Sequence, residues 1–370
     1  MIPYGRQMIG EDDVKAVAEA LRHDYLTTGP KVGEFEGKIA NYVNAKHCVA
    51  VNSGTSALDI AVASLNLPPG SEIITTPFTF VASSNCILYN GCRPVFADIG
   101  PKTYNISPDE IKRKITGKTK AILCVDYAGQ PCSIDEIREI ADEHNLFLIE
   151  DAAHSLGAKY KGEMVGGLAD LTTFSFHPVK VMTTGEGGAV ATNNDELYEK
   201  MKMLRSHGID KGPLEREGYE YDMKVLGRNY RLTDFQCALG MKQLERVGEF
   251  IRKRNEIAKM YNDGLAGVDG ITLPHVSDYV RHAWHLYTIL LSDRIKRDKF
   301  FAEIRGNGIG VNVHYIPVYK FTYYHGIFGA QTLPITEDIS SRIVSLPMFP
   351  GLSENDVDNV IRKVKECIRE

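Results

Sequence analysis

Short apolar, β-branched runs alternate with amphipathic helical stretches along the first half of the chain. The runs predict buried strands at residues 47–51, 72–76, 94–97, 121–125 and 147–149. Two further strands are predicted within residues 170–176 and 187–192. Nearly continuous apolar strands separated by helices are typical of a mostly parallel sheet that is covered on both faces. The pattern therefore predicts an α/β fold.

Helical spacing of apolar residues predicts the helices around this sheet. One helix near the N-terminus would present Val14, Val17, Ala18 and Leu21 on one face, and the next would present Phe35, Ile39, Tyr42 and Val43. A long helical stretch runs from Asp234 to about Ala266, followed by strand-like residues 285–291 and 310–313 and a C-terminal helix after Ser353. We expect a large α/β domain over residues 1–245 and a smaller α+β domain over residues 246–370.

Composition and charge narrow the classes of function. The 370 residues include 43 Lys and Arg against 48 Asp and Glu, a net charge of −5, which gives no general attraction to nucleic acid or to an anionic membrane. No apolar run approaches the length of a membrane span, and the N-terminus lacks the apolar core of a signal peptide. Seven cysteines, an odd number, show no zinc-ligand spacing, so no metal is predicted. We expect a cytoplasmic enzyme of a reducing compartment.

Three segments after predicted strands carry candidate chemistry, because ligands of open α/β sheets bind beyond the carboxyl ends of the strands. Residues 52–57, NSGTSA, combine a glycine and hydroxyl residues at a helix start, which suits a phosphate; a helix cap by Ser53 or Thr55 is the ordinary alternative. Asp151 ends an apolar strand, and His154 follows it. Lys180 follows an aromatic strand and precedes a small, turn-rich stretch, a setting that can desolvate an amine.

Taken one by one, these signals have ordinary structural explanations: a cap, a paired edge carboxylate, a solvated lysine. Together, a phosphate site, a strand-end aspartate and a loop lysine are the groups that pyridoxal 5′-phosphate (PLP) requires. The phosphate would anchor the cofactor, the aspartate would keep the pyridine nitrogen protonated, and the lysine would bind the aldehyde and then move protons.

The segments NSGTSAL, EDAAHSLGA, FSFHPVK with TTGEGG, and GRNYRLTDFQCALG resemble the DegT/DnrJ/EryC1/StrS sugar aminotransferases. The resemblance covers essentially the whole chain. It implies a fold-type I PLP enzyme that works as a homodimer on nucleotide-linked keto sugars. Within the family, HPVK, YAGQPC and GIGVNVHYIPVY are most similar to the branch of UDP-4-amino-4,6-dideoxy-N-acetyl-β-L-altrosamine transaminases, which act in pseudaminic acid biosynthesis.

The resemblance also implies a role for each matched residue. Lys180 would form the Schiff base, and Asp151 would pair with the pyridine nitrogen. The other cofactor contacts that it implies are Thr55, Ser56 and Ser175 at the phosphate, His154 at the 3′-oxygen face, Phe80 stacked on the ring, and Asn229, which would reach the phosphate of the other subunit. Thr28, Gly29, His314 and Tyr315 match substrate contacts in relatives. For Phe80, a plain core aromatic explains the sequence as well, and so do plain turn and strand positions for the four substrate residues.

The reaction that the resemblance implies is transfer of an amino group from L-glutamate to the C4 keto group of a UDP-linked 2-acetamido-2,6-dideoxy-hexos-4-ulose, with 2-oxoglutarate as the other product. A related sugar dehydratase would carry histidine in place of Lys180. An aminotransferase of the same family acting on another UDP- or dTDP-linked 3- or 4-keto sugar is the main alternative. A non-catalytic PLP-binding regulator would need no proton-transfer lysine.

Overall fold

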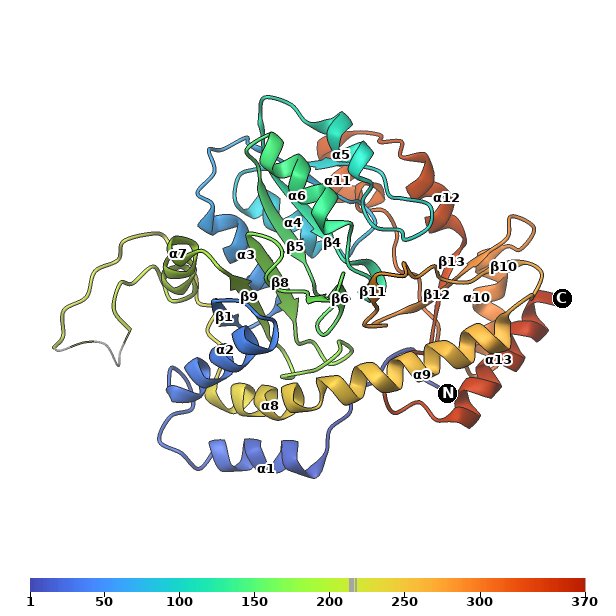
Figure 1. The fold of residues 1–370 in the computed structure, drawn as a ribbon, viewed down its shortest axis with the longest axis horizontal. Helices are drawn as coiled ribbons and strands as arrows, with labels where there is room; N and C mark the ends of the chain where they lie inside the picture. The colour runs from blue at the N-terminus through green and yellow to red at the C-terminus, as the bar shows by residue number, and fades with distance from the viewer. Residues whose placement is uncertain (213–215, 217, 370) are drawn as a thin grey trace.

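A seven-stranded sheet forms the centre of the computed structural model, which describes residues 1–212, 216 and 218–369 (Figure 1). Its strands, in their order across the sheet, are β1 (His47–Val51), β9 (Gly188–Thr192), β8 (Leu171–Ser175), β5 (Phe147–Asp151), β4 (Thr119–Val125), β2 (Glu72–Thr75) and β3 (Arg93–Phe96). β9 pairs antiparallel with β1 and with β8, and the other pairs are parallel. The predicted mostly parallel sheet is confirmed.

Helices cover both faces of this sheet, which is why its strands are apolar throughout. In β4, Leu123 packs into one core cluster with Ile60 of α3, whereas its neighbour Ile122 packs into another with Ile137 of α6. Successive side chains of a strand point to opposite faces, so both faces must be apolar. The helices of this part are α1 (Glu11–Ala20), α2 (Pro30–Tyr42), α3 (Gly54–Ser64), α4 (Ala82–Tyr89), α5 (Pro108–Lys114), α6 (Ile134–Glu143), α7 (Asp195–Arg205) and α8 (Asp234–Glu245).

A smaller three-stranded sheet holds the C-terminal part of the chain together. Its order is β10 (Ile271–Thr272), β12 (Tyr287–Leu291) and β13 (Ile343–Leu346), and its core includes the apolar face of α13 (Glu354–Arg369), with Val357, Val360 and Val364 buried. The other elements are α9 (Val247–Leu265), α10 (Arg297–Gly306), α11 (Thr322–Phe328), α12 (Pro334–Arg342), the 3₁₀ turns η1 (Tyr127–Gly129) and η2 (Val318–Lys320), and a third sheet of β11 (Val280–Arg281), β6 (Lys159–Tyr160) and β7 (Glu163–Met164).

The long helical stretch predicted after Asp234 consists of two helices. α8 ends at Glu245 and α9 begins at Val247, with Arg246 between them, and in Figure 1 the two helices follow one another from above α1 toward the right. The domain boundary expected between residues 245 and 246 falls at this junction, and the division into two domains stays a prediction.

Two local predictions were wrong. The expected apolar face of α1 is not its buried face: Val14 and Leu21 are each 53% exposed, whereas Asp13 is buried and accepts hydrogen bonds from Gln243 (2.9 Å) and Arg246 (3.3 Å). The strand expected over residues 310–313 is absent, because the described backbone pairs there only as an isolated bridge between Asn312 and Ser345. A buried polar network therefore replaces the predicted apolar contacts of α1. An irregular segment replaces the predicted strand.

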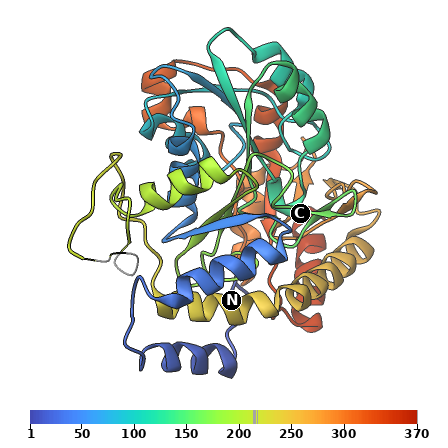
Figure 2. The same ribbon diagram turned by 60° about the vertical axis from the view of Figure 1, so that its left-hand side comes forward.

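The segment between α7 and α8 projects from the molecule in both ribbon views (Figures 1 and 2). We call its described residues, 206–212, 216 and 218–233, the arm. The base of the arm is anchored on α3, where the buried carboxylate of Asp59 accepts hydrogen bonds from Arg228 (3.2 Å) and Tyr230 (2.9 Å). The base of the arm is thus attached to the same helix whose first residues carry the candidate phosphate site.

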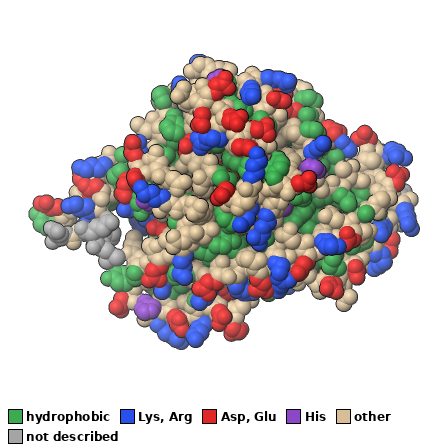
Figure 3. Space-filling model, in the orientation of Figure 1, with side chains coloured by type: hydrophobic (Ala, Val, Ile, Leu, Met, Phe, Trp, Pro, Cys, Tyr) green, Lys and Arg blue, Asp and Glu red, His purple; other side chains and the backbone are tan. Residues whose placement is uncertain are grey.

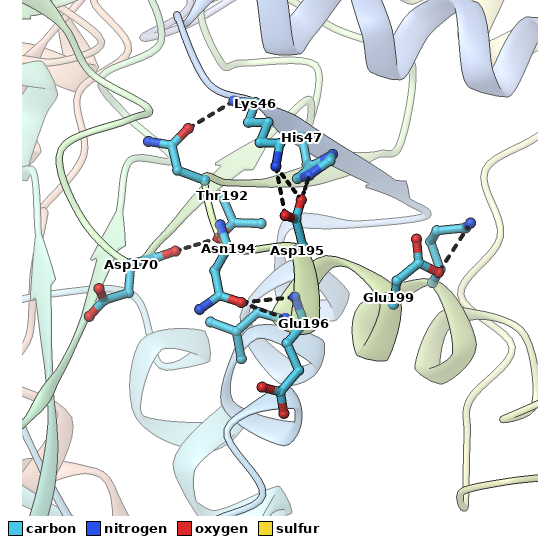
Figure 4. A network of polar contacts seen from close by, with 11 residues as sticks. Lys46, His47, Asp170, Thr192, Asn194, Asp195, Glu196 and Glu199 are labelled. Carbon is cyan, nitrogen blue, oxygen red and sulfur yellow. Dashed lines mark hydrogen bonds and ion pairs between the residues drawn. The ribbon is translucent and has the colours of Figure 1, made fainter.

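Polar contacts at the start of α7 fix the edge of the sheet that β1 forms (Figure 4). Asn194 caps the helix by accepting hydrogen bonds from the backbone N–H groups of Glu196 (2.9 Å) and Leu197 (3.0 Å). Asp195 pairs with Lys46 and His47 beside β1. These solvent-accessible contacts cap α7 and join it to the start of β1. We assign them a structural role only.

Charged side chains of both signs are scattered over the face of the molecule shown in Figure 3. Among the described helices, none is both long and apolar enough to cross a membrane. The described residues also contain no cluster of three or more His, Cys, Asp or Glu side chains placed to hold a metal ion. All seven cysteines are buried, and none of them forms a disulfide.

Candidate active site

A cavity of about 830 Å³ opens at the carboxyl ends of β4, β5 and β8, where Val125, Asp151 and Ser175 line it. It brings together most of the residues predicted from the sequence. The predicted residues that line it are Thr55, Ser56, Phe80, Asp151, His154, Ser175, Lys180, His314 and Tyr315. Residues far apart in the sequence thus meet at one sheet edge, as expected for an open α/β fold.

One end of the cavity is the start of α3. Ser53 caps the helix by accepting a hydrogen bond from the backbone N–H of Ser56 (3.0 Å), and the hydroxyl of Ser56 donates to Asn52 (2.7 Å). The cap explanation therefore holds for Ser53, while Thr55 lines the cavity. A Cβ on Gly54 would lie 2.7 Å from the Cβ of Ser175, so only glycine allows the loop to pack this closely against β8. Free N–H groups and the positive helix end suit a phosphate here.

Asp151, the last residue of β5, lies deep in the cavity. One carboxylate oxygen accepts a hydrogen bond from the hydroxyl of Ser83 (2.7 Å), and the other accepts one from the backbone N–H of Ala153 (3.2 Å). Burial raises the pKa of Asp151, while these two donors and the charge of Lys180 act in the opposite direction. These two donors hold the carboxylate in one orientation. A cationic ring nitrogen placed beside it would be a further partner.

Lys180 stands in the turn that follows β8. Its backbone N–H donates to the carbonyl of His177 (2.9 Å), which closes the turn. Burial lowers the pKa of its amine to about 8, against the charge of Asp151, which raises it. A lysine whose pKa lies near neutrality has an appreciable neutral fraction, which a nucleophile or a proton-transfer base needs.

His154 packs against two residues from the C-terminal part of the chain, His285 and Tyr315. Its Nε2 lies 3.1 Å from the hydroxyl of Tyr315, its Nδ1 has no hydrogen-bond partner in the described protein, and its ring centroid lies 4.3 Å from that of His285. Burial, followed by the charge of Lys180, moves the pKa of His154 well below its usual value. The imidazole is therefore neutral at physiological pH.

His314 is held by the smaller sheet. Its Nδ1 lies 2.8 Å from the hydroxyl of Ser345, on β13, and its Nε2 lies 3.3 Å from the side-chain amide of Asn312. Burial lowers the pKa of His314 to about 4, so this ring is also neutral. One backbone bridge, between Asn312 and Ser345, and the side-chain contacts of His314 thus bring the irregular segment 312–315 to the cavity.

Three of the predicted site residues lie outside the cavity, whereas Phe80 lines it. Phe80 lies at the cavity with 60% of its surface exposed, which excludes the core-aromatic explanation. Thr28 and Gly29 do not line the cavity of this chain, because the N–H of Gly29 donates to Asp234 (2.9 Å) and fixes the start of α2 against α8. Asn229 lies at the base of the arm, bridged to Ser206, and does not line this cavity either.

Several lining residues were missed from the sequence. Ser83 binds Asp151, and its only sequence signal is a hydroxyl one turn beyond Phe80. His285 begins a predicted strand and lines the cavity with its Nδ1 unpartnered. Tyr4 also reaches the cavity, because the first residues pair beside Ile309, and no local pattern indicates such a contact.

The donor set fits PLP. The glycine-dependent helix start provides an anion site, and a lysine of lowered pKa and a buried carboxylate line the same cavity. The cavity volume lies in the range typical of cofactor and ligand sites. The described residues that line it include one lysine and no arginine.

Comparison with known proteins agrees with this site. Residues 7–365 match the model of the DegT/DnrJ/EryC1/StrS aminotransferase family. The chain is 38% identical to the UDP-4-amino-4,6-dideoxy-N-acetyl-β-L-altrosamine transaminase of Campylobacter jejuni, over 99% of each protein. It is also 38% identical to the spore coat polysaccharide biosynthesis protein SpsC of Bacillus subtilis, over 100% of this chain and 97% of that protein.

Solved structures give the same answer for the fold. PseC of Helicobacter pylori, an aminotransferase involved in the biosynthesis of pseudoaminic acid, matches 100% of this chain and 99% of its own with a TM-score of 0.96 and 34% identity. Spr1654 of Streptococcus pneumoniae in its PLP form matches 100% of this chain and 98% of its own, with a TM-score of 0.94 and 30% identity.

Fold, site and relatives agree on a PLP-dependent sugar aminotransferase with the fold-type I architecture. Within that class, the chain belongs to the DegT/DnrJ/EryC1/StrS aminotransferase family. The family resemblance predicted from the sequence motifs is thereby confirmed.

Proposed function

We propose that the protein transfers the amino group of L-glutamate to the C4 keto group of a UDP-linked 2-acetamido-2,6-dideoxy-hexos-4-ulose, forming UDP-4-amino-4,6-dideoxy-N-acetyl-β-L-altrosamine for pseudaminic acid synthesis. The observation that carries the amino transfer is the meeting of Lys180, Asp151 and the start of α3 in one cavity. Support for this particular sugar comes from the C. jejuni transaminase and from PseC.

Lys180 would hold PLP through its Nζ, and its free amine would take up and return the proton at the substrate carbon. Bound PLP supplies an electron sink for the carbanion that this proton transfer creates. The lowered pKa of Lys180, about 8, keeps part of the amine neutral for both tasks. Asp151, fixed by Ser83 and Ala153, holds a proton on the ring nitrogen.

The other contacts follow from their places in the cavity. Thr55, Ser56 and Ser175 would bind the phosphate with the N-terminal amides of α3, and Phe80 would cover the ring. The neutral His154 would contact the 3′-oxygen side, as the family resemblance implies. On the substrate side we assign His314 and Tyr315 of this chain, and Thr28 and Gly29, which lie outside the cavity of a single chain.

The active form that we propose is a homodimer in which Asn229 binds the phosphate of the other subunit. Two features support it: the arm projects from the rest of the chain in both ribbon views, and its base is anchored by Asp59. The cavity of one chain holds Lys180 as its single lysine and no described arginine, so cations for a diphosphate must come from elsewhere.

A direct assay tests the proposal. The purified protein with PLP and L-glutamate is incubated with a panel of UDP- and dTDP-linked 4-keto sugars, and the aminated products are identified by mass spectrometry and NMR. We expect amination of the UDP-linked acetamido sugar, and none by Lys180→Ala. Amination of a dTDP-sugar alone would overturn the proposed substrate but not the reaction class.

A second candidate is amination of another nucleotide-linked keto sugar. It is favoured by the equal identity, 38%, to SpsC of B. subtilis, which belongs to spore coat polysaccharide biosynthesis. The same panel separates the two, because the products differ in nucleotide and in sugar.

A further inference from the structure

Two carboxyl groups without an assigned role are buried beside Asp151. Asp126 follows the end of β4, and Glu150 stands in β5 directly before Asp151, and each has 0% exposed surface. Because successive strand residues point to opposite faces, Glu150 points away from the cavity that Asp151 enters. The backbone N–H of Asp126 donates to the carbonyl of Asp151 (3.1 Å), so the two strand ends are tied together.

The hydrogen-bond partners of the two carboxyls differ. Asp126 accepts from the backbone N–H of Cys132 (2.9 Å) and from the hydroxyl of Ser155 (2.5 Å). Glu150 accepts from the hydroxyl of Thr172 (3.2 Å) with one oxygen. Its other oxygen, Oε1, is fully buried without a donor in the described protein.

Glu150 lies opposite Cys124 in the pairing of β4 with β5, so Asp126, two residues beyond Cys124, lies on the same face of the sheet as Glu150. Two ionised carboxylates are acceptors only, so a hydrogen bond between them requires a proton. Asp126 already accepts two hydrogen bonds that stabilise its charged form, whereas Glu150 accepts one, so the proton belongs on Glu150. Burial raises the pKa of both groups, and the charge of Asp126 raises that of Glu150 further.

We propose that Glu150 stays protonated in the folded protein at neutral pH and donates its proton to Asp126, and that this pair positions the turn carrying Asp151 and His154. The turn is reached through Ser155, which donates to Asp126 from the residue after His154. Neither carboxyl touches substrate or cofactor, so both are positioning residues.

The retained proton also limits the charge near Asp151. An ionised Glu150 would add a second like charge beside it and favour protonation of Asp151. A neutral Glu150 therefore helps Asp151 to remain a carboxylate, the state that the proposed function requires of it. Two thiols, Cys132 and Cys124, also lie beside the pair. Burial raises the pKa of Cys132. The hydrogen bond with Cys132 lowers the pKa of Cys124, but burial and the charges of the two carboxyls raise it by more.

Infrared spectroscopy of the full chain without cofactor tests the proton itself. At pH 8 we expect the carbonyl band of a protonated carboxylic acid, lost in Glu150→Gln and retained in the matched control Asp151→Asn. No such band in the unsubstituted protein, or a band that survives in Glu150→Gln, would overturn the proposal. Because no cofactor or sugar is present, either result leaves the proposed function untouched.

The pH dependence of stability tests the positioning role. The folded protein keeps a proton that the unfolded chain releases near pH 4 to 5, so its melting temperature should fall as pH rises from 5 to 8. Glu150→Gln can donate the same hydrogen bond without a proton to lose, so its fall should be less than half as large. Glu150→Ala should melt at least several degrees lower at every pH, because Asp126 loses its donor.

Equal melting temperatures for Glu150→Gln and Glu150→Ala, with an unchanged pH dependence, would contradict the role. If Glu150→Gln does not fold, Ser155→Ala replaces it. Removal of that hydroxyl withdraws a donor from Asp126 and disfavours the ionised pair, so the infrared band should persist to a pH higher than in the unsubstituted protein. A band that disappears at the same pH or lower would count against the pair.

Discussion

The hydroxyl of Tyr315 lies 3.1 Å from Nε2 of His154, which joins the turn after β5 to a segment of the C-terminal part of the chain. His154 has no other hydrogen-bond partner among the described residues, since its Nδ1 is buried and unpartnered. The orientation of this imidazole in the protein alone therefore depends on one hydroxyl group.

We expect Tyr315→Phe to lower kcat/KM for the sugar about fivefold, the equivalent of one hydrogen bond of about 1 kcal/mol. The visible absorption of the bound cofactor should remain, because Lys180 and Asp151 are untouched. Steady-state kinetics measure the change, with Tyr323→Phe, at an exposed position, as the matched control. An unchanged kcat/KM would show that the contact does not orient His154.

The rate at which the cofactor-free protein binds PLP covalently should depend on pH through Lys180. The amine must be neutral to attack the aldehyde, and its pKa is about 8, so the rate should rise with pH and level off above about 8. Well below that value it should fall about tenfold per pH unit. Stopped-flow absorbance follows the reaction.

Asp151→Asn provides the comparison for this pH profile. The charge of Asp151 raises the pKa of Lys180, so its removal should move the midpoint to lower pH. Both proteins use the same PLP, so ionisations of free PLP cancel. A midpoint near 10.5 in the unsubstituted protein would mean that Lys180 is solvated and not buried.

Gly54→Ala should weaken PLP binding by about 5- to 150-fold. The added Cβ would lie 2.7 Å from the Cβ of Ser175, and overpacking of this kind costs about 1–3 kcal/mol. Equilibrium titration of PLP onto the cofactor-free protein measures the affinity. Gly33→Ala, where a Cβ meets nothing within 4 Å, should bind PLP normally. Normal binding by Gly54→Ala would place the phosphate elsewhere.

Shared active sites predict complementation between two inactive variants. Lys180→Ala and Asn229→Ala subunits, mixed and re-associated, should form heterodimers in which one of the two sites has both residues intact. Activity should recover to about a quarter of the unsubstituted level, because half of the dimers are mixed and each has one complete site. Heterodimers verified by mass spectrometry that remain inactive would contradict the role of Asn229.

The parts of the fold that follow from local patterns were predicted correctly. β1 was predicted at its observed bounds, since a short apolar run there is followed at once by a capped helix start. The residues after β5 and β8 were predicted to carry chemistry because strand ends converge in this fold class, and Asp151 and Lys180 do line one cavity.

The failures involve contacts between distant segments. Asp13 looks like a surface residue of α1, yet Gln243 makes it a buried acceptor, and no periodicity within residues 11–20 indicates that partner. Ser83 was missed for the same reason, since its role depends on Asp151, 68 residues further along the chain. Local spacing predicts where a helix or strand lies but not which distant residues it contacts. The candidate site depends largely on such contacts.

The antiparallel strand β9 has a consequence for how reaction specificity can change in this fold. Ser175 of β8 pairs with Gly188 of β9, and Phe176 bonds to Gly187, so the twelve residues between the paired ends form a loop closed at its base. Lys180 lies on this loop, whereas the phosphate site lies against its closed end. The cavity-lining positions of the loop, such as His177 and Val179, can therefore vary while the anchoring point of the cofactor stays in register, whereas Val181 and Met182 are fixed in the core. Changes at Lys180 and at the other cavity-lining residues of the loop would therefore alter the chemistry without rebuilding the scaffold.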